Sequence, residues 1–274
     1  MKKIASFLIL FLSFFSQISA QIEQYPLGAR SIAMGTASLT LQDQWAFFNN
    51  PSGTASLEDA SVFFAYENRF GVSAFQTFGV GGVLPLKIGT VGAGVSRFGD
   101  ELYNELKAGV SFSKKIDMVS LGLKVNYVQV AIRDLNSKGA LVLEFGGLVQ
   151  ITKQIYLAGY IYNLNQAKFK TAFEQDELIP TILKAGLGYQ PIKPLFISIE
   201  TVKDIDLPAS FNAGVEYQIV KNLNFRTGIQ TEPFRNHFGL GFSPKTFHFD
   251  YALSTGNDLG LSHHISFGYR FTKK

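Results

Sequence analysis

Apolar and polar residues alternate along most of the chain from residue 61 onward. In the clearest stretch, Ser210 to Ile219, one face carries Phe211, Ala213, Val215, Tyr217 and Ile219, and the other carries Ser210, Asn212, Gly214, Glu216 and Gln218. Alternation with a period of two residues is typical of a β-strand whose faces meet different surroundings. The chain is therefore predicted to be all-β.

Residues of the types Gly, Pro, Asn, Asp and Lys divide this part of the chain into about fourteen segments of roughly ten residues each. The predicted strands are residues 61–67, 72–85, 89–99, 103–115, 118–133, 138–152, 154–165, 180–191, 194–204, 208–220, 222–232, 235–244, 246–255 and 260–271. An even number of strands returns both ends of a bacterial barrel to the same side of the membrane.

Two of these segments break the regular alternation. The apolar phase of 118–133 switches between Tyr127 and Val128, which predicts either a β-bulge or a strand that continues beyond the bilayer. The glycine-rich segment around Gly79 and Gly81 is poorly phased and is predicted to bend inward.

A soluble β-sandwich would also show alternation, so the composition of the two faces has to decide. The apolar faces are rich in Phe, Tyr and Leu, whereas the opposite faces carry Gly, Ser, Asn and isolated charges of both signs. The outer faces of a sandwich normally carry many charged residues for solubility, while a barrel lumen favours small residues and paired charges. The pattern favours a transmembrane antiparallel β-barrel over a sandwich.

The composition supports the same choice. Of 274 residues, 46% are hydrophobic and only 17% charged, 26 are Phe and none is Cys. A disordered chain, a disulfide scaffold, a zinc module built on thiolates and thiol catalysis are thereby excluded. Beyond residue 20 no apolar run is long enough for a membrane-spanning helix.

The first twenty residues have the pattern of a signal peptide. Lys2 and Lys3 precede an apolar stretch from Ile4 to Phe15, and Ala20 provides a small residue for cleavage. Cleavage would remove both lysines and reduce the net charge from +4 to +2, so the basic isoelectric point is no indication of nucleic-acid binding. The predicted organisation is a cleaved signal peptide (1–20), an N-terminal hatch (21–58) and a barrel (59–274), located in a bacterial outer membrane.

The segment from residue 22 to residue 58 does not alternate and is predicted to plug the lumen. Residues 27–37 are dense in small side chains, which allow close backbone packing in a confined space. Trp45 begins an aromatic cluster that ends in an Asn-Pro turn at Asn50 and Pro51.

Residues 28–35, Gly-Ala-Arg-Ser-Ile-Ala-Met-Gly, followed by residues 49–53, Asn-Asn-Pro-Ser-Gly, resemble a known family. They are similar to the FadL-like outer-membrane proteins, especially the PorV/PorQ branch of Bacteroidetes. The chain departs from the family pattern at Thr36 and Ser52, and it is short. The resemblance implies a fourteen-stranded barrel with a hatch in its lumen, in agreement with the strands predicted from alternation.

Several residues are candidates for holding the hatch in place. Arg30 and Asn50 are expected to anchor it through hydrogen bonds, together with Pro51 and Gly53 of the turn. Inward-facing charges are expected to pair across the lumen and with the hatch, because isolated charges in a confined space are costly. The main members of this predicted lumen charge network are Lys184, Glu200, Glu216, Arg226, Asp250 and Arg270, and Lys107, Lys124 and Glu144 also face inward.

The His and Ser residues near the C-terminus give only a weak indication of chemistry. His264 and Ser266 share a face, and His248 and Asp250 lie on the preceding strand, but no motif fixes a catalytic arrangement. A metal site formed by His237, His248 and His264 would require a strand register that the sequence does not give. The residues are interpreted as polar packing in the lumen, so neither an enzyme nor a cofactor is predicted.

Two functions remain open. The resemblance implies an interaction protein of the type IX secretion system, contacting other subunits or secreted cargo in addition to outer-membrane lipids. The alternative is a FadL-like channel for hydrophobic small molecules, in which Trp45, Phe47 and Phe48 would contact the ligand. Transport predicts a continuous apolar cavity, whereas secretion does not.

Overall fold

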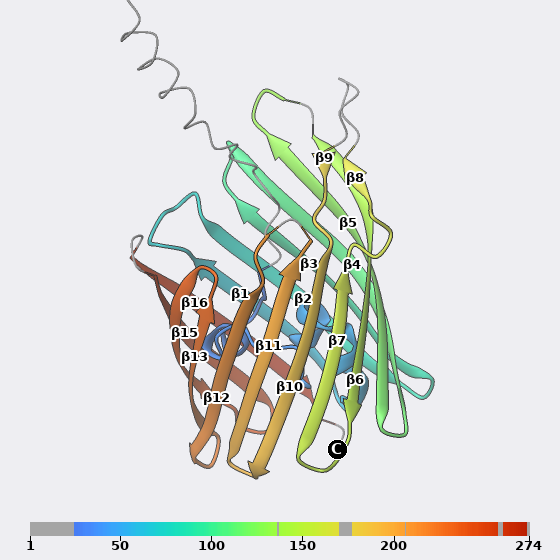
Figure 1. The fold of residues 1–274 in the computed structure, drawn as a ribbon, viewed down its shortest axis with the longest axis vertical. Helices are drawn as coiled ribbons and strands as arrows, with labels where there is room; N and C mark the ends of the chain where they lie inside the picture. Colours follow the sequence, from blue (N-terminus) through green and yellow to red (C-terminus); the bar gives the residue numbers. More distant parts are fainter. Residues whose placement is uncertain (1–24, 136, 170–176, 206, 257–259, 273–274) are drawn as a thin grey trace, which may run out of the picture.

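The barrel is visible in the computed structural model, which describes residues 25–135, 137–169, 177–205, 207–256 and 260–272 (Figure 1). Within these residues, fourteen strands close into one barrel in the order β1, β16 back to β10, then β7 back to β2. Each neighbouring pair is antiparallel. The predicted transmembrane antiparallel β-barrel is confirmed, while the predicted signal peptide lies outside the described residues.

The strands follow the predicted segments closely. They are β1 (Ala60–Asn68), β2 (Gln76–Leu86), β3 (Gly89–Gly99), β4 (Tyr103–Ile116), β5 (Val119–Ile132), β6 (Lys138–Gln150), β7 (Ile155–Tyr162), β10 (Ile182–Ile192), β11 (Leu195–Asp204), β12 (Ser210–Val220), β13 (Leu223–Thr231), β14 (Phe234–Phe242), β15 (Phe247–Gly256) and β16 (Leu261–Phe271). A small two-stranded sheet, β8 (Lys168–Phe169) with β9 (Glu177–Leu178), was not predicted. It lies in the connection between β7 and β10, which is the longest one in the barrel.

The two ends of the barrel differ. Ala60 at the start of β1 pairs with Phe271 at the end of β16, so the barrel begins and finishes at one end, the lower one in Figure 1. We call this the terminal end and the opposite one the loop end. The terminal end has short hairpin connections such as residues 87–88 and 221–222, whereas the long 163–181 connection belongs to the loop end.

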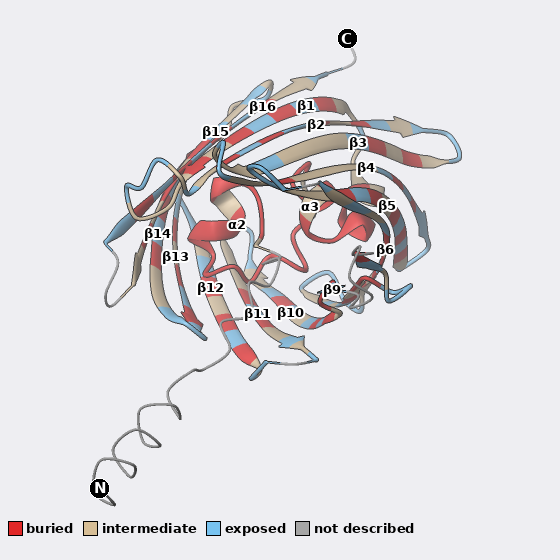
Figure 2. Ribbon diagram, turned by 90° about the horizontal axis from the view of Figure 1, so that it is seen from above, coloured by how far each residue is buried: buried red, intermediate tan, exposed pale blue. Residues whose placement is uncertain are grey.

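The barrel wall is apolar outside and polar inside. Along β12, Phe211, Val215 and Tyr217 are exposed on the outer face, while Asn212 and Gly214 are buried on the lumen side. The alternation of buried and exposed residues around the ring is visible from above (Figure 2). Among the described residues, no helix is both long and apolar enough to cross a membrane.

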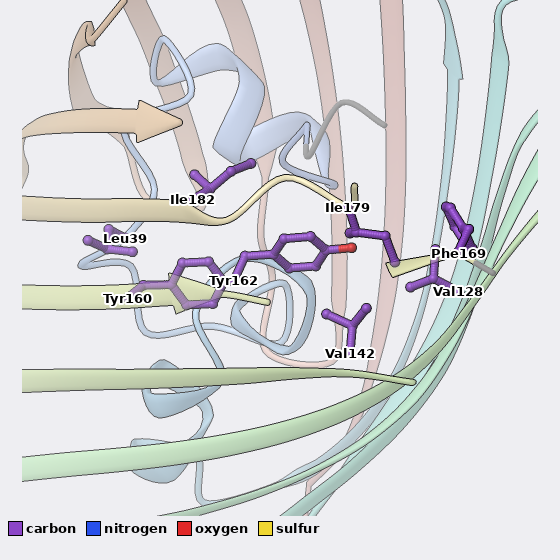
Figure 3. Close-up of a cluster of buried hydrophobic side chains, with 8 residues drawn as sticks. All are labelled: Leu39, Val128, Val142, Tyr160, Tyr162, Phe169, Ile179 and Ile182. Carbon is purple, nitrogen blue, oxygen red and sulfur yellow. The ribbon is translucent and has the colours of Figure 1, made fainter. Parts of the chain in front are cut away.

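Of the two alternatives given for the phase switch between Tyr127 and Val128, the β-bulge is wrong. β5 pairs with β4 and β6 without any shift of register, and Val128 is buried in the lumen. The apolar phase switches because the lumen itself is apolar at this position. Val128 belongs to a buried cluster with Leu39, Val142, Tyr160, Tyr162, Phe169, Ile179 and Ile182 (Figure 3).

The strand pairing around Gly79 and Gly81 is regular, and the inward bend expected there stays a prediction. β2 keeps a continuous register with β1 and with β3, and both glycines face the lumen within the wall. Their phase is difficult to recognise in the sequence because a glycine has no side chain to mark its face. The strand pairing here is regular, and the glycines add no side chains to the lumen face of the wall.

The hatch fills the middle of the lumen (Figure 2). It contains the short helices α2 (Ala29–Ala33) and α3 (Ala46–Asn49) and the 3-10 helix η1 (Pro51–Ser56). α2 packs against strands β13 to β16, and η1 packs against β3 to β6. The hatch therefore bridges opposite walls and divides the lumen into a loop-end part and a terminal-end part.

Candidate functional site

An ionic cluster joins the hatch to the wall near the terminal end. Arg30 donates hydrogen bonds of 2.9 and 2.6 Å to the carboxylate of Glu216 on β12, and one of 2.9 Å to Asp43 of the hatch. Arg226 also donates to Glu216, and its Nη1 lies 2.6 Å from Oδ1 of Asp250. Burial alone would lower the pKa of Arg30, but Glu216 and Asp43 outweigh it and raise the pKa above its ordinary value. The guanidinium therefore stays charged in the lumen.

A second carboxylate holds the other side of the hatch. Glu200 on β11 accepts hydrogen bonds of 2.9 Å from the backbone N–H groups of both Ser38 and Leu39. Its other oxygen lies 3.7 Å from Nζ of Lys184 on β10. Two backbone donors and one cation compensate the burial of this carboxylate, which is almost completely removed from solvent.

The six charges predicted as the lumen charge network thus divide into separate groups. Lys184 and Glu200 form one pair, while Glu216, Arg226 and Asp250 join Arg30 in another group. Arg270 makes no ion pair with any residue that the structure describes. It lines a cavity of about 220 Å³ beside this group, together with His248 and Asn224.

The predicted turn at Asn50 organises the hatch from within. The Asn50 amide donates to the carbonyl of Leu39 at 2.8 Å, and its Oδ1 accepts from the Ser52 hydroxyl at 2.8 Å. Pro51 begins η1 and its carbonyl accepts a hydrogen bond from Thr54. Gly53 fits closely, because a Cβ there would lie 2.5 Å from the Leu41 carbonyl oxygen.

Asn49, which the sequence did not single out as an anchor, makes as many side-chain hydrogen bonds as Asn50. Its side chain exchanges two hydrogen bonds of 3.0 Å with the backbone of Leu27 and donates a third to Ser31 at 2.8 Å. The start of the hatch is thereby tied to α3 and α2. Asn49 also belongs to the motif that carries the family resemblance. That motif is the sequence signal that could have identified it as an anchor.

Glycines on the wall, which have no side chains, allow the hatch to lie directly against the backbone of the strands. A Cβ at Gly214 or at Gly228 would collide with the backbone of Met34 and Gly35. Gly35 has φ +65°, a conformation that glycine adopts without strain, and a Cβ there would meet the carbonyl oxygen of Ala213. Glycines on both partners therefore permit a contact that side chains would prevent.

A cavity of about 420 Å³ lies on the loop-end side of the hatch, bounded by strands β1 to β6. We call it the loop-side cavity. Its apolar lining consists of Tyr25, Leu27, Phe48, Phe75, Phe98 and Tyr103, and its polar lining of Glu67, Arg69, Thr77, Ser96, Glu105, Lys107, Lys124, Asn126 and Glu144. The volume falls in the range of small-molecule sites, and the mixture of aromatic and polar groups is typical of them.

The three aromatic residues proposed as ligand contacts separate in the structure. Phe48 lines the loop-side cavity. Phe47 is fully buried against Gly92 and Gly94 of the wall, and Trp45 lines the charged cavity at the terminal end. Phe48 is therefore the member of the predicted trio that is placed to meet a molecule in the loop-side cavity.

Most residues that line the loop-side cavity were not selected from the sequence. Phe98 alternates regularly on β3, but nothing in the pattern distinguished it from other lumen residues. Phe75 was placed within the predicted strand 72–85, whereas it lies in the connection between β1 and β2. Lys124 and Glu144 were recognised as inward charges, but not as neighbours of Phe48.

Part of the wall between β2 and β3 consists of small residues, which the rings of Phe47 and Phe63 cover from the lumen. Gly81 pairs with Gly94 on the lumen side, and Gly82 pairs with Ala93 on the outer side. Outside the same strands lies an apolar hollow of about 730 Å³, bordered by Leu84, Phe112, Leu123 and Phe271. We call this part of the wall the β2–β3 seam.

His264 and Ser266, which were interpreted as polar packing in the lumen, have separate hydrogen-bond partners. Ser266 accepts a hydrogen bond from the backbone of Ala29 in the hatch. His264 instead lies 3.0 Å from the hydroxyl of Ser254, which is also 2.8 Å from His237. Asp250 is held by Arg226, away from this chain of hydrogen bonds. Among the described residues, no group of three or more His, Cys, Asp or Glu side chains is arranged to hold a metal ion.

Comparison with known proteins gives a structural likeness only. No known protein-family model matches the chain, and no curated protein matches its sequence. The fold is similar to the Ralstonia pickettii toluene transporter TbuX, with a TM-score of 0.71 and 14% identity over 91% of this chain and 100% of the other. It is also similar to the Pseudomonas putida toluene transporter TodX (0.66, 12%, 90% and 97%) and to a Pseudomonas aeruginosa FadL homologue (0.58, 13%, 92% and 98%). At these identities the likeness establishes the fold.

Proposed function

We propose that this protein is a bacterial outer-membrane channel that takes up small hydrophobic molecules. The observation that carries the proposal is the loop-side cavity, which combines aromatic lining with a position between the loop end and the hatch. The structural likeness to two toluene transporters supports the same proposed function. Of the two functions left open by the sequence, transport is the one that predicts a continuous apolar cavity. The loop-side cavity meets this expectation in part, because its lining is both aromatic and polar and it ends at the hatch.

The route out of the cavity is proposed to run sideways through the β2–β3 seam. Leu27 lines the cavity and lies directly against Gly79, and Phe47 lies against Gly92 and Gly94. No interlocking side chains hold the seam between Gly81 and Gly94 or between Gly82 and Ala93. A shift of the hatch that withdraws these two side chains would leave the Phe63 ring of β1, which lies against Gly81, and the backbone hydrogen bonds between the lumen and the outer hollow.

Uptake of radiolabelled toluene by cells that express the protein tests the function. Phe48→Ala is expected to lower the initial uptake rate about three- to tenfold, because an aromatic contact with the passing molecule is lost. Phe64→Ala, on the lipid-facing side of β1, is the matched control and should leave uptake unchanged. Equal uptake in cells with and without the wild-type protein would refute the function.

A second pair of variants tests the route. Gly82→Phe is expected to fill the outer hollow and to reduce uptake strongly, since Gly82 faces that hollow without close neighbours. Gly159→Phe places the same side chain in open space on β7 and serves as control. If Gly82→Phe transports normally while Phe48→Ala does not, the molecule leaves through the charged cavity at the terminal end instead.

The role in type IX secretion stays a prediction that rests on residues 28–35 and 49–53. Affinity purification of the protein from native membranes in mild detergent, followed by mass spectrometry, separates the two functions. Stoichiometric secretion subunits would favour the secretion role, whereas an isolated barrel carrying a hydrophobic molecule would favour transport.

A further inference from the structure

The apolar hollow outside the β2–β3 seam is shaped by small residues. Gly82 and Ala93, which are paired across the two strands, line it on the outer face of the wall. Its border includes Leu84, Phe112 and Phe271. The outer face of a transmembrane barrel is covered by lipid acyl chains. A depression of about 730 Å³ in this face is therefore a place where an acyl chain can lie close to the backbone of the wall.

The hollow lies toward the terminal end of the barrel. Ala60 and Phe271, which pair at the start of β1 and the end of β16, both line it. The terminal end has the short hairpin turns, and short turns are typical of the periplasmic side of an outer-membrane barrel. A lipid in the hollow would therefore belong to the periplasmic leaflet, whose headgroups lie at the level of these turns.

Two lysines lie between the hollow and the terminal end. Lys114 follows Phe112 by two residues and shares its outer face of β4, and Lys87 lies in the turn between β2 and β3. The register of β3 with β4 places Lys114 level with Gly89, the first residue after that turn. Each ammonium group stands on a flexible stem of four carbons, so both groups can reach one anion between them.

Neither of these two ammonium groups is neutralised by a carboxylate. Lys87 and Lys114 are both exposed, and neither makes an ion pair with any residue in the described part of the chain. Lys115 adds a third positive charge beside them. Acidic residues lie nearby at Asp117, in the next turn, and at residues 58–59, before β1. The site therefore combines an apolar space with two cations that can bind an anionic oxygen.

The distance between the lysines and the centre of the hollow suits an acyl chain. Gly89 and Ala93 are four residues apart on β3, which corresponds to about 13 Å along the strand. The acyl layer of one leaflet is about 15 Å thick. A chain whose headgroup lies level with Lys114 thus reaches the small residues at the centre of the hollow.

From these features together we infer that a phospholipid of the periplasmic leaflet binds at a specific site outside the β2–β3 seam. One acyl chain occupies the hollow against Gly82 and Ala93, and the phosphate accepts hydrogen bonds from Lys87 and Lys114. Long basic side chains at a membrane boundary extend toward the headgroups and favour anionic lipid groups. The inference goes beyond the transport function, because it concerns the outer face of the barrel and holds whether or not a molecule passes through the lumen.

Native mass spectrometry of the purified barrel in an uncharged detergent tests the site. The two probes are dioleoyl-phosphatidylglycerol and dioleoylglycerol, which share both acyl chains and differ in the phosphate headgroup. The barrel is expected to retain one molecule of phosphatidylglycerol and to bind it about tenfold or more tightly than dioleoylglycerol, because both ammonium groups bind the phosphate.

The lysines are tested by a pair of double variants. Lys87→Gln combined with Lys114→Gln is expected to weaken the binding of phosphatidylglycerol about tenfold and to leave that of dioleoylglycerol unchanged. Lys193→Gln combined with Lys221→Gln is the matched control. It removes two exposed lysines from terminal-end turns on the opposite side of the ring, and it should change neither affinity.

The hollow is tested by a change of size. Ala93→Leu fills its centre and is expected to weaken the binding of both lipids about threefold or more, because the acyl chain loses its contact with the wall. Ala185→Leu makes the same change at an exposed position on the outer face of β10 and serves as the control.

The outcomes decide between a lipid and other occupants. Equal binding of the two lipids, no bound lipid, or an equal loss of phosphatidylglycerol in both lysine variants would overturn the inference. A dimer of the barrel that Ala93→Leu dissociates would also overturn it, because a second copy would then cover the hollow. A preference for phosphatidylglycerol that Lys87→Gln with Lys114→Gln removes and the control preserves would establish it. Uptake of toluene is measured separately, so the lipid site and the proposed function can fail independently.

Discussion

At the scale of single residues, the lumen is organised by charges that reach across large distances in the sequence. Arg30 and Glu216 are 186 positions apart and still form two hydrogen bonds. Burying such a pair is not in itself a strong source of stability, but removing one partner leaves the other uncompensated. The ionic cluster therefore fixes where the hatch lies more than it adds to the overall stability.

Replacing Arg30 by Met should loosen the hatch. Asp43 and Glu216 would lose their shared cation, and we expect the free energy of unfolding in lipid vesicles to fall by about 3 kcal/mol. Amides of residues 29–33 should also exchange hydrogen faster. Arg133→Met provides the control, since its 2.7 Å ion pair with Glu101 is exposed and should contribute less than about 1 kcal/mol. Equal losses in the two variants would contradict the role given to Arg30.

The face of the strand on which a residue lies was predictable from alternation, but its hydrogen-bond partners were not. The inward positions of Lys184 and Glu200 follow from the period of two along their strands. That Glu200 accepts from the backbone of Ser38 and Leu39 depends on how an irregular segment lies in the lumen, for which the sequence has no periodic signal. Phe75 was placed in the predicted strand 72–85 but lies in the connection before β2, so the alternation along that strand could not give its facing.

At the scale of elements, contact between the hatch and the strands depends on glycines in regular wall positions. Gly214 on β12 and Gly228 on β13 face each other across a strand pair, and the end of α2 lies against both. Side chains at these two positions would keep the hatch several ångströms away from the wall. The strands and the hatch are thus complementary in shape as well as in charge.

Gly214→Ala should displace the hatch, although the change adds a single methyl group. The new Cβ would collide with the Met34 backbone, which cannot rotate away, and we expect a loss of about 1–3 kcal/mol in the free energy of unfolding. Gly159→Ala makes the same change on β7, where nothing lies within 4 Å, and should be nearly neutral. Urea titration of both variants in lipid vesicles measures the difference, and a neutral Gly214→Ala would contradict the close contact.

The ends of the strands were predictable because apolar and polar residues alternate along each strand and turn residues separate one strand from the next. β3 was predicted at the observed residues, and most other strand ends differ by one or two residues, though β2 begins four residues later and β7 ends three earlier than predicted. The alternation was difficult to interpret where the side chains do not indicate which face of the strand they occupy. Val128 is apolar on the lumen side because an apolar cluster occupies that side, and Gly79 and Gly81 carry no side chain at all.

At the scale of the whole molecule, the outer face determines where the protein can exist. Large apolar side chains such as Phe64, Phe112 and Phe211 are exposed around the barrel. An apolar surface that surrounds a closed barrel requires lipid or detergent to cover it. The barrel leaves no open strand edge through which copies would pair.

The protein should therefore sediment with the outer membrane and stay there during carbonate washing. After extraction in detergent, the closed barrel should migrate faster on an SDS gel before boiling than after it, because the folded form resists SDS. Recovery of the folded protein in a detergent-free soluble fraction would contradict the membrane assignment. A tagged periplasmic protein from the same cells provides the control for leakage between fractions.

The hatch is joined to the barrel by a short linker. η1 ends at Ser56 and β1 begins at Ala60, so only residues 57–59 separate the plug from the wall. A plug on so short a tether cannot diffuse away when it is displaced, and its effective concentration at its own seat stays very high. Closure is accordingly a unimolecular event whose rate does not depend on how many copies the membrane holds. In the proposed transport function, each channel would reseal by itself after each passage, and the fraction of channels that stand open would not change as expression rises.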